Sequence, residues 1–231
     1  MKLYSILLLV LFTPLFIQSQ TYEIGGYFGG ANFIGDVGST TYIAPNTPAF
    51  GALVRWNRSA RHSFRGSIIF AAIEGDDSKS HESRRKERGY TFENSITEVS
   101  LGLEYTFWDF DVHSGKTVSA PYLYTGLTYF WYNALYKTPN GSEIKDFDGA
   151  SSFAIPMVLG YKVTLGTKFV LAGEIGARYT FTDGIDGSNP VKGLKDNENV
   201  KFGNINNNDW YMFTGITLSF TFGRKPCYCD F

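Results

Sequence analysis

The segment from residue 210 to residue 222 alternates strictly between two kinds of side chain. One set is mostly apolar: Trp210, Met212, Thr214, Ile216, Leu218, Phe220 and Phe222. The intervening set is small or polar apart from two aromatics: Tyr211, Phe213, Gly215, Thr217, Ser219 and Thr221. A period of two is typical of a strand with one apolar and one polar face. A tilted strand crosses a bilayer in about 9–11 residues, so the segment predicts the closing strand of an outer-membrane β-barrel.

The N-terminal sequence has the pattern of an export signal. Lys2 precedes an apolar run from Leu3 to Ile17, and Gln-Ser-Gln follows it. This predicts a secretory signal peptide over residues 1–19, with cleavage near Ser19. No Cys follows the run directly, which argues against a lipoprotein. We therefore expect a barrel over residues 20–223 and a periplasmic tail over residues 224–231.

The same alternation marks eight strands, which predict an all-β, eight-stranded antiparallel transmembrane barrel. Their expected ranges are 21–34, 48–57, 62–74, 93–107, 120–133, 151–164, 167–182 and 209–223. An even number of strands places both termini on the periplasmic side of the outer membrane. Loop lengths favour the same topology, because three shorter connections, 58–61, 108–119 and 165–166, alternate with four longer ones, 35–47, 75–92, 134–150 and 183–208.

The faces of these strands are assigned by their charges. If the apolar face points outward, eight charged residues point into the barrel: Glu23, Arg55, Arg65, Glu98, Glu104, Lys162, Glu174 and Arg178. An Arg or Lys facing lipid at mid-bilayer costs about 2–4 kcal/mol, which favours this assignment. An eight-stranded barrel is just wide enough for side chains to fill. The sequence thus predicts a lumen plugged by paired charges, and an anchor rather than a pore.

The sequence offers no catalytic arrangement. Its three histidines, His62, His81 and His113, fall at a strand edge, an outer loop and an inner turn. The segment from Asp183 to Asn189 has acids and glycines as calcium loops do, but it lacks the alternating acid spacing of an EF-hand and is better explained as a turn. The net charge of −1 argues against a nucleic-acid partner. We expect a non-enzymatic protein without a cofactor or a metal.

Two clusters of residues are candidates for contacts with other molecules. The basic cluster Arg84, Arg85, Lys86 and Arg88 lies in the second outer loop, where it would bind lipopolysaccharide phosphates or simply provide solubilising charge. The only cysteines, Cys227 and Cys229, lie in the tail. Cα atoms two residues apart in an extended segment are about 6.6 Å apart, near the limit for a disulfide. In the oxidising periplasm, they form either a disulfide to a partner or a strained local bridge, unless they are kept reduced.

Four stretches together resemble the PorG family. They are Gly29-Gly-Ala-Asn-Phe-Ile-Gly-Asp-Val-Gly38, Phe181-Thr-Asp-Gly-Ile-Asp-Gly-Ser-Asn-Pro190, Gly203-Asn-Ile-Asn-Asn-Asn-Asp-Trp-Tyr211 and Phe222-Gly-Arg-Lys-Pro-Cys-Tyr-Cys-Asp-Phe231. PorG proteins are outer-membrane barrels of the type IX secretion system of Bacteroidota. The resemblance implies a docking role for the periplasmic ring of PorK/GldK lipoprotein and PorN/GldN, in a machine that secretes cargo and, in gliding species, adhesins. The alternative is a stand-alone OmpX-like barrel that acts in adhesion or envelope integrity.

Overall fold

The structure is a computed structural model that describes residues 21–138, 141–142, 144–204 and 206–223. The expected signal peptide and the tail with Cys227 and Cys229 lie outside the described residues.

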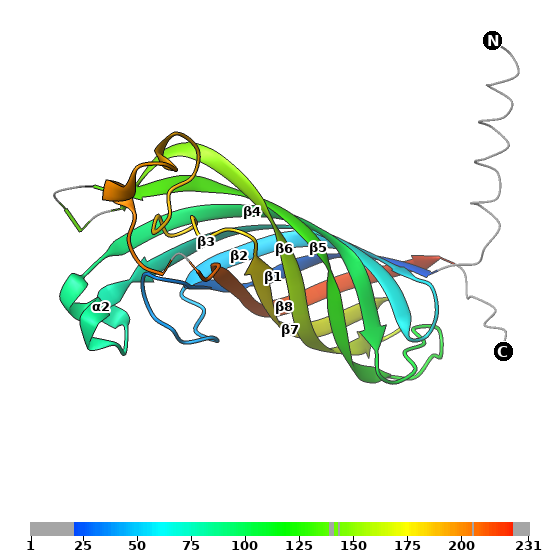
Figure 1. Cartoon of the computed structure of the whole chain (residues 1–231). Helices are drawn as coiled ribbons and strands as arrows, with labels where there is room; N and C mark the ends of the chain where they lie inside the picture. The colour runs from blue at the N-terminus through cyan, green and yellow to red at the C-terminus, as the bar shows by residue number, and fades with distance from the viewer. Residues whose placement is uncertain (1–20, 139–140, 143, 205, 224–231) are drawn as a thin grey trace, which may run out of the picture.

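Eight antiparallel strands form a single closed barrel (Figure 1), which confirms the expected fold class. Each strand pairs with its neighbours in sequence, and the last strand pairs with the first from Thr21↔Gly223 to Ile34↔Trp210. The strands are β1 (Thr21–Ile34), β2 (Thr47–Asn57), β3 (His62–Asp76), β4 (Thr91–Thr106), β5 (Ser119–Lys137), β6 (Ile144–Leu165), β7 (Phe169–Thr180) and β8 (Trp210–Gly223).

The prediction of a loop over residues 134–150 is wrong for most of these residues, which belong to strands. β5 continues to Lys137 and β6 begins at Ile144, so the two strands form a longer hairpin than expected (Figure 1). The pairing register shifts between Ala134 and Leu135. A bulge interrupts the alternation of faces, and for this reason the sequence pattern ended the strand too early.

The two ends of the barrel differ. The terminal end holds the first residue of β1, the last of β8, and the turns 58–61, 107–118 and 166–168. The opposite end, the loop end, holds the longer segments 35–46, 77–90 and 181–209 and the tip of the β5–β6 hairpin. These segments contain the short helices η2 (Asp77–Lys79), α2 (Ser83–Arg88), η3 (Lys192–Leu194) and η4 (Glu198–Val200).

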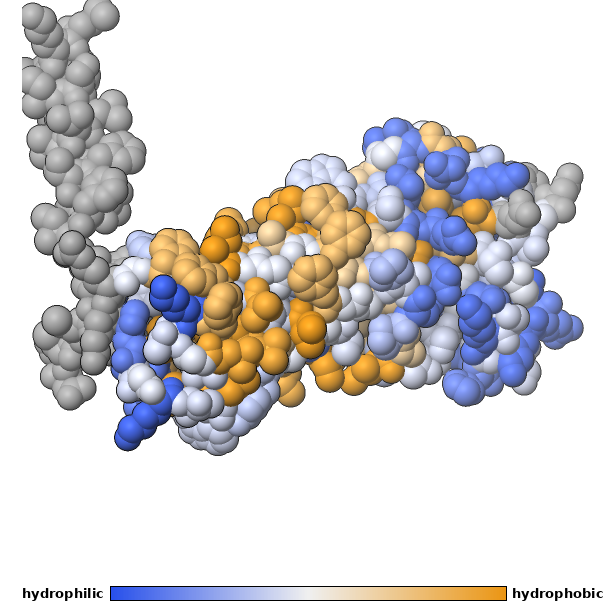
Figure 2. All heavy atoms as spheres, turned by 180° about the vertical axis from the view of Figure 1, so that it is seen from behind, coloured by the Kyte–Doolittle hydropathy of each residue, from blue (hydrophilic) through white to orange (hydrophobic). Residues whose placement is uncertain are grey.

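Apolar side chains cover the outside of the barrel between these two ends. On the face seen in Figure 2 they cover the middle of the barrel, and hydrophilic residues gather towards the ends. Phe28, Leu101 and Leu159 of this apolar surface are 61%, 67% and 58% exposed. Aromatic pairs border it, such as Trp56 with Phe64 near the terminal end and Tyr179 with Trp210 near the loop end. No helix among the described residues has the length and apolar character needed to cross a bilayer.

Candidate functional site

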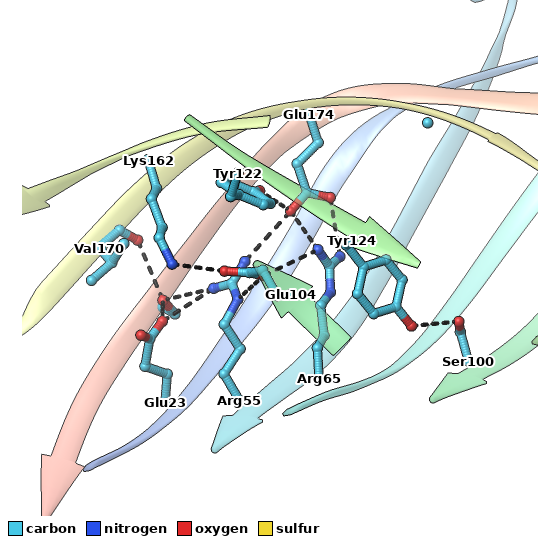
Figure 3. A network of polar contacts seen from close by, with 12 residues as sticks. Glu23, Arg55, Arg65, Ser100, Glu104, Tyr122, Tyr124, Lys162, Val170 and Glu174 are labelled. Carbon is cyan, nitrogen blue, oxygen red and sulfur yellow. Dashed lines mark hydrogen bonds and ion pairs between the residues drawn. The ribbon is translucent and has the colours of Figure 1, made fainter. Parts of the chain in front are cut away.

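The interior of the barrel is centred on Arg55 of β2. Its guanidinium contacts three carboxylates: Glu23 at 3.1 Å, Glu104 at 2.8 Å and Glu174 at 3.4 Å. These acids come from β1, β4 and β7, so one cation joins opposite walls of the barrel (Figure 3). The Arg55 side chain is fully buried. Burial of a charge is costly unless it is paired, and here every side of the guanidinium faces an acid.

Two further cations complete this cluster. Arg65 forms a two-pronged contact with Glu174, with N–O distances of 2.7 and 3.0 Å, and Lys162 lies 2.8 Å from Glu104. The hydroxyl of Tyr122 also donates a hydrogen bond to Glu174. We call the six charged residues the central network: Glu23, Arg55, Arg65, Glu104, Lys162 and Glu174.

Gly160 makes room for this arrangement. A Cβ atom at residue 160 would lie 2.3 Å from the ring of Tyr122, the residue opposite it on β5. Any larger residue at this position would displace the phenol that donates to Glu174. Gly160 therefore leaves the space in which the Tyr122 ring lies beside the central network.

A separate ion pair lies nearer the loop end of the lumen. Arg178 of β7 contacts Glu98 of β4 at 3.0 Å. The hydroxyl of Tyr211 donates to the same Glu98 at 2.8 Å, and the ring of Phe213 lies 4.4 Å from the Arg178 guanidinium carbon. The structure thus places all eight charges that the sequence assigns to the lumen inside the barrel, with side chains no more than 4% exposed. Four acids balance four bases.

The terminal end of the lumen is covered by the turn 107–118. Its residues Phe110 and Val112 pack with Ala120 and Val170 in a small buried cluster. The amide of Phe110 donates to the Ala60 carbonyl at 3.0 Å, and the Lys162 ammonium lies 4.6 Å from the Phe110 ring. This turn is longer than the other two at this end because it folds back over the barrel opening.

Three segments cover the loop end, and together we call them the loop cap: 35–46, 77–90 and 181–209. The buried carboxylate of Asp186 accepts from the amides of Asp36 at 2.9 Å and Val37 at 3.1 Å. Arg85 of α2 donates to the carbonyls of Gly35 and Gly38. Each of the three segments therefore has a polar contact with another, and Val37 and Ile185 add fully buried apolar side chains.

The loop cap contains four neighbouring acids: Asp36, Asp183, Asp186 and Asp209. Burial raises the pKa of Asp183 to about 7, with a further contribution from the charges of Asp186 and Asp36. Burial also raises the pKa of Asp186, and it raises the pKa of Asp209 well above its usual value, helped by Asp186 and Asp183. One oxygen of Asp209 accepts from the Ile185 amide at 2.9 Å, while the other oxygen and one of Asp183 have no hydrogen-bond partner among the described residues.

The basic cluster is divided by the fold. Arg85 faces the carbonyls of segment 35–46, and Arg88 contacts Asp77 at 2.8 Å and the Asp36 carbonyl at 2.6 Å. Arg84 and Lys86 are exposed. Only this second pair is placed to meet a ligand outside the protein, because the first pair is held inside the loop cap.

The three histidines have separate surroundings. His62 contacts Ser59, His113 contacts Thr21, and His81 is exposed in the segment 77–90. Within the described part of the chain, no group of three or more histidine, cysteine and acidic side chains is arranged to hold a metal ion. The calcium-like segment from Asp183 to Asn189 instead forms a series of bends, in which the Ser188 amide donates to Asp186.

Sequence reasoning missed several residues that complete these clusters. Tyr122 and Tyr211 share the inward face with the charges, and the strand alternation itself would have marked them. The loop-cap acids carry no such signal, because Asp36 and Asp186 lie in irregular segments far apart in the sequence.

Several proteins of solved structure are similar to this chain, all at low sequence identity. The chain is similar to Ail, the attachment invasion locus protein of Yersinia pestis, solved with a heparin analogue (9% identity over 88% of this chain and 99% of that chain, TM-score 0.49). It is also similar to the N-terminal barrel of Pseudomonas aeruginosa OprF (13% identity, 89% and 98% coverage, TM-score 0.45) and to Neisserial surface protein A (10% identity, 88% and 97% coverage, TM-score 0.45). At these scores the fold assignment rests on the strand pairing itself.

No curated protein matches the sequence significantly. A family model described as a domain of unknown function, DUF6089, matches residues 1–231. The chain therefore belongs to the DUF6089 family.

Proposed function

We propose that the protein is a non-enzymatic anchor in the bacterial outer membrane. The observation that carries this proposal is a barrel with an apolar exterior and an interior filled at three levels. The loop cap, the lumen ion pairs and the turn 107–118 occupy successive parts of the axis. A lumen filled in this way among the described residues argues against the conduction of solutes, so we assign the function to partners that bind at the two ends.

The terminal end is assigned to the periplasm, because short turns and both chain ends face this side in bacterial barrels. Single cysteines at Ser78, Gly141 and Asn197, all exposed at the loop end, test this orientation on whole cells. In a chain whose native cysteines are serine, an impermeant thiol reagent should label these three positions and leave a cysteine at Ser59 unlabelled. Labelling of Ser59 alone would invert the barrel.

At the periplasmic side the anchor attaches the ring of PorK/GldK and PorN/GldN to the outer membrane in a type IX secretion machine. Support comes from the resemblance of four sequence stretches to the PorG family. The tail adds a chemical argument, since it carries Cys227 and Cys229 and the periplasm is oxidising. A disulfide to the lipoprotein would provide a lasting link.

Non-reducing electrophoresis of cell envelopes tests the link to the ring. The protein should run in a heavier band with the PorK/GldK lipoprotein, and the band should collapse on reduction. The Cys227→Ser, Cys229→Ser double variant should lose the band and secrete less cargo while the barrel stays inserted. Normal secretion by this variant, or an internal bridge found by mass spectrometry, would remove the tail from the docking account.

A stand-alone surface barrel is the second candidate. It is favoured by an outward cleft of about 880 Å³ at the loop end, between the β3–β4 and β5–β6 hairpins. Glu74, Glu93 and Asp146 are among the residues that line it. Arg84 and Lys86 add exposed positive charge on α2, where they would contact lipopolysaccharide phosphates.

Matched changes at the two ends separate these candidates. The tail double variant should impair secretion and leave envelope integrity unchanged if the protein is a ring anchor. Replacing Arg84→Glu and Lys86→Glu should have the opposite effect if the loop end carries the function. Loss of surface adhesion or detergent resistance in the second variant, with full secretion in the first, would favour the surface barrel.

A further inference from the structure

The loop cap contains more buried acid than its hydrogen bonds satisfy. Asp209 is 1% exposed and Asp183 is 8% exposed, and each has one carboxylate oxygen without a partner among the described residues. An ionised carboxylate accepts hydrogen bonds and donates none. A buried oxygen without a donor is costly when charged, whereas a protonated carboxyl can itself donate to a neighbouring acceptor.

The charges around these two groups are mostly negative. Asp186 and Asp183, on the same segment, act on Asp209, as does Asp36 from segment 35–46. From β5 the phenol of Tyr132 interacts electrostatically with Asp209. Arg88 of α2 is the cation in electrostatic contact with the cluster through Asp186.

Arg88 is already paired with the buried carboxylate of Asp77 at 2.8 Å, so the four acids leave an excess of negative charge if all of them are ionised. We propose that the loop cap is a proton-dependent lock, which is closed while Asp183 and Asp209 hold protons and loosens when both ionise. The ligand of this device is the proton, and the moving part comprises residues 181–204, which include Asp183 and Asp186.

The contacts that would be released when the acids ionise are hydrogen bonds between two segments of the loop cap. Segment 181–209 meets segment 35–46 through Asp186, which accepts from the amides of Asp36 and Val37, and through the Asn204 amide, which donates to the Asp36 carboxylate at 2.9 Å. When Asp209 and Asp183 are charged, repulsion from Asp186 and Asp36 acts across this contact. The central network lies below and keeps the lumen filled, so loosening exposes loops without opening a channel.

The direction of the effect follows from linkage. Ionisation of a buried acid is favoured in the open cap, where water solvates the charge, so the closed cap holds more protons. Closure is therefore strongest in acid and weakens as the pH rises through about 7, the value for Asp183. The amides of Val37 and Ile185, which donate to Asp186 and Asp209, report directly on closure.

Hydrogen–deuterium exchange of the full chain in lipid nanodiscs tests the lock. Peptides that contain residues 35–38 and 183–188 should lose at least about tenfold in protection between pH 5.5 and pH 8.5, after correction for intrinsic exchange rates. The Asp183→Asn, Asp209→Asn double variant mimics the protonated acids and should keep high protection at both pH values. The variant Asp196→Asn is the matched control, because it removes one exposed acid from the same segment and should behave as wild type.

The remaining outcomes count against the proposal. Equal protection of the wild type at both pH values would overturn it, and so would a pH response that survives in the double variant. If the double variant loses protection in acid as well, the acids act as structural acceptors and the lock is rejected. A heat-modifiability gel shows whether each variant still forms the barrel.

Discussion

The lumen and the loop cap bury charge in opposite ways. In the lumen four acids meet four bases, and Arg55 alone contacts three carboxylates. In the loop cap the buried carboxylates of Asp186 and Asp209 rely on backbone amides. Attraction between paired charges offsets much of the cost of burying them, whereas an excess of one sign has no such offset. The comparison indicates a rigid plug in the middle and a condition-dependent lid at one end.

Of the changes considered, removal of Arg55 from the lumen should lower the free energy of unfolding most. Arg55→Leu leaves Glu23, Glu104 and Glu174 short of a partner at once, and loss of one member of a buried ion pair costs about 3–5 kcal/mol. We expect the free energy of unfolding in lipid, measured by urea titration, to fall by at least this much. Arg61→Leu is the control, because its ion pair with Asp109 is exposed and should contribute little. Equal losses in both variants would show that the central network is not what holds the barrel.

The ion pair between Arg178 and Glu98 tests whether the lumen charges stabilise the barrel because they are balanced. Arg178→Leu leaves Glu98 with the hydroxyl of Tyr211 as its remaining side-chain donor, so we expect a loss of about 3 kcal/mol. Replacing both partners, Arg178→Leu with Glu98→Leu, should recover much of that loss, because no buried charge is left unpaired. The double-mutant cycle is measured by the same urea titration. A double variant that is less stable than the single one would indicate that the pair has a role beyond neutralisation.

The loop cap should respond to pH with a smaller effect on stability. The pKa of Asp183 in the folded protein is about 7, above its usual 3.8, so its stabilising contribution is full below about 3.8 and is lost as the pH rises through 7. The melting temperature of the wild type should fall over this range, and Asp183→Asn should flatten part of the slope. A melting temperature that rises with pH in the wild type, and not in this variant, would contradict the assignment.

The barrel could be predicted from the sequence because the alternation of apolar and polar residues is present within each strand. β1 matches the expected range 21–34, and the inward charges follow from the same alternation. The pattern failed where a bulge at Ala134 and Leu135 shifts the faces, which hid the loop-end part of the β5–β6 hairpin.

The contacts of the loop cap could not be predicted from the sequence pattern. Arg85 and Arg88 lie in a basic cluster that suggested an outer ligand, yet they donate to residues 35–38 and Asp77, almost all of them distant in the sequence. Contacts of this kind depend on how irregular segments fold together, and no periodic pattern encodes them.

The central claim is that the barrel is closed along its axis whatever the state of the loop cap. Planar-bilayer recording of the purified full chain at pH 5.5 and pH 8.5 tests it most directly, with a general porin as the positive control. We predict no steady conductance of porin size at either pH, because the lumen ion pairs and the turn 107–118 remain in place when the loops loosen. Large, stable channels in the unmodified protein at either pH would contradict a sealed barrel and, with it, the anchor function.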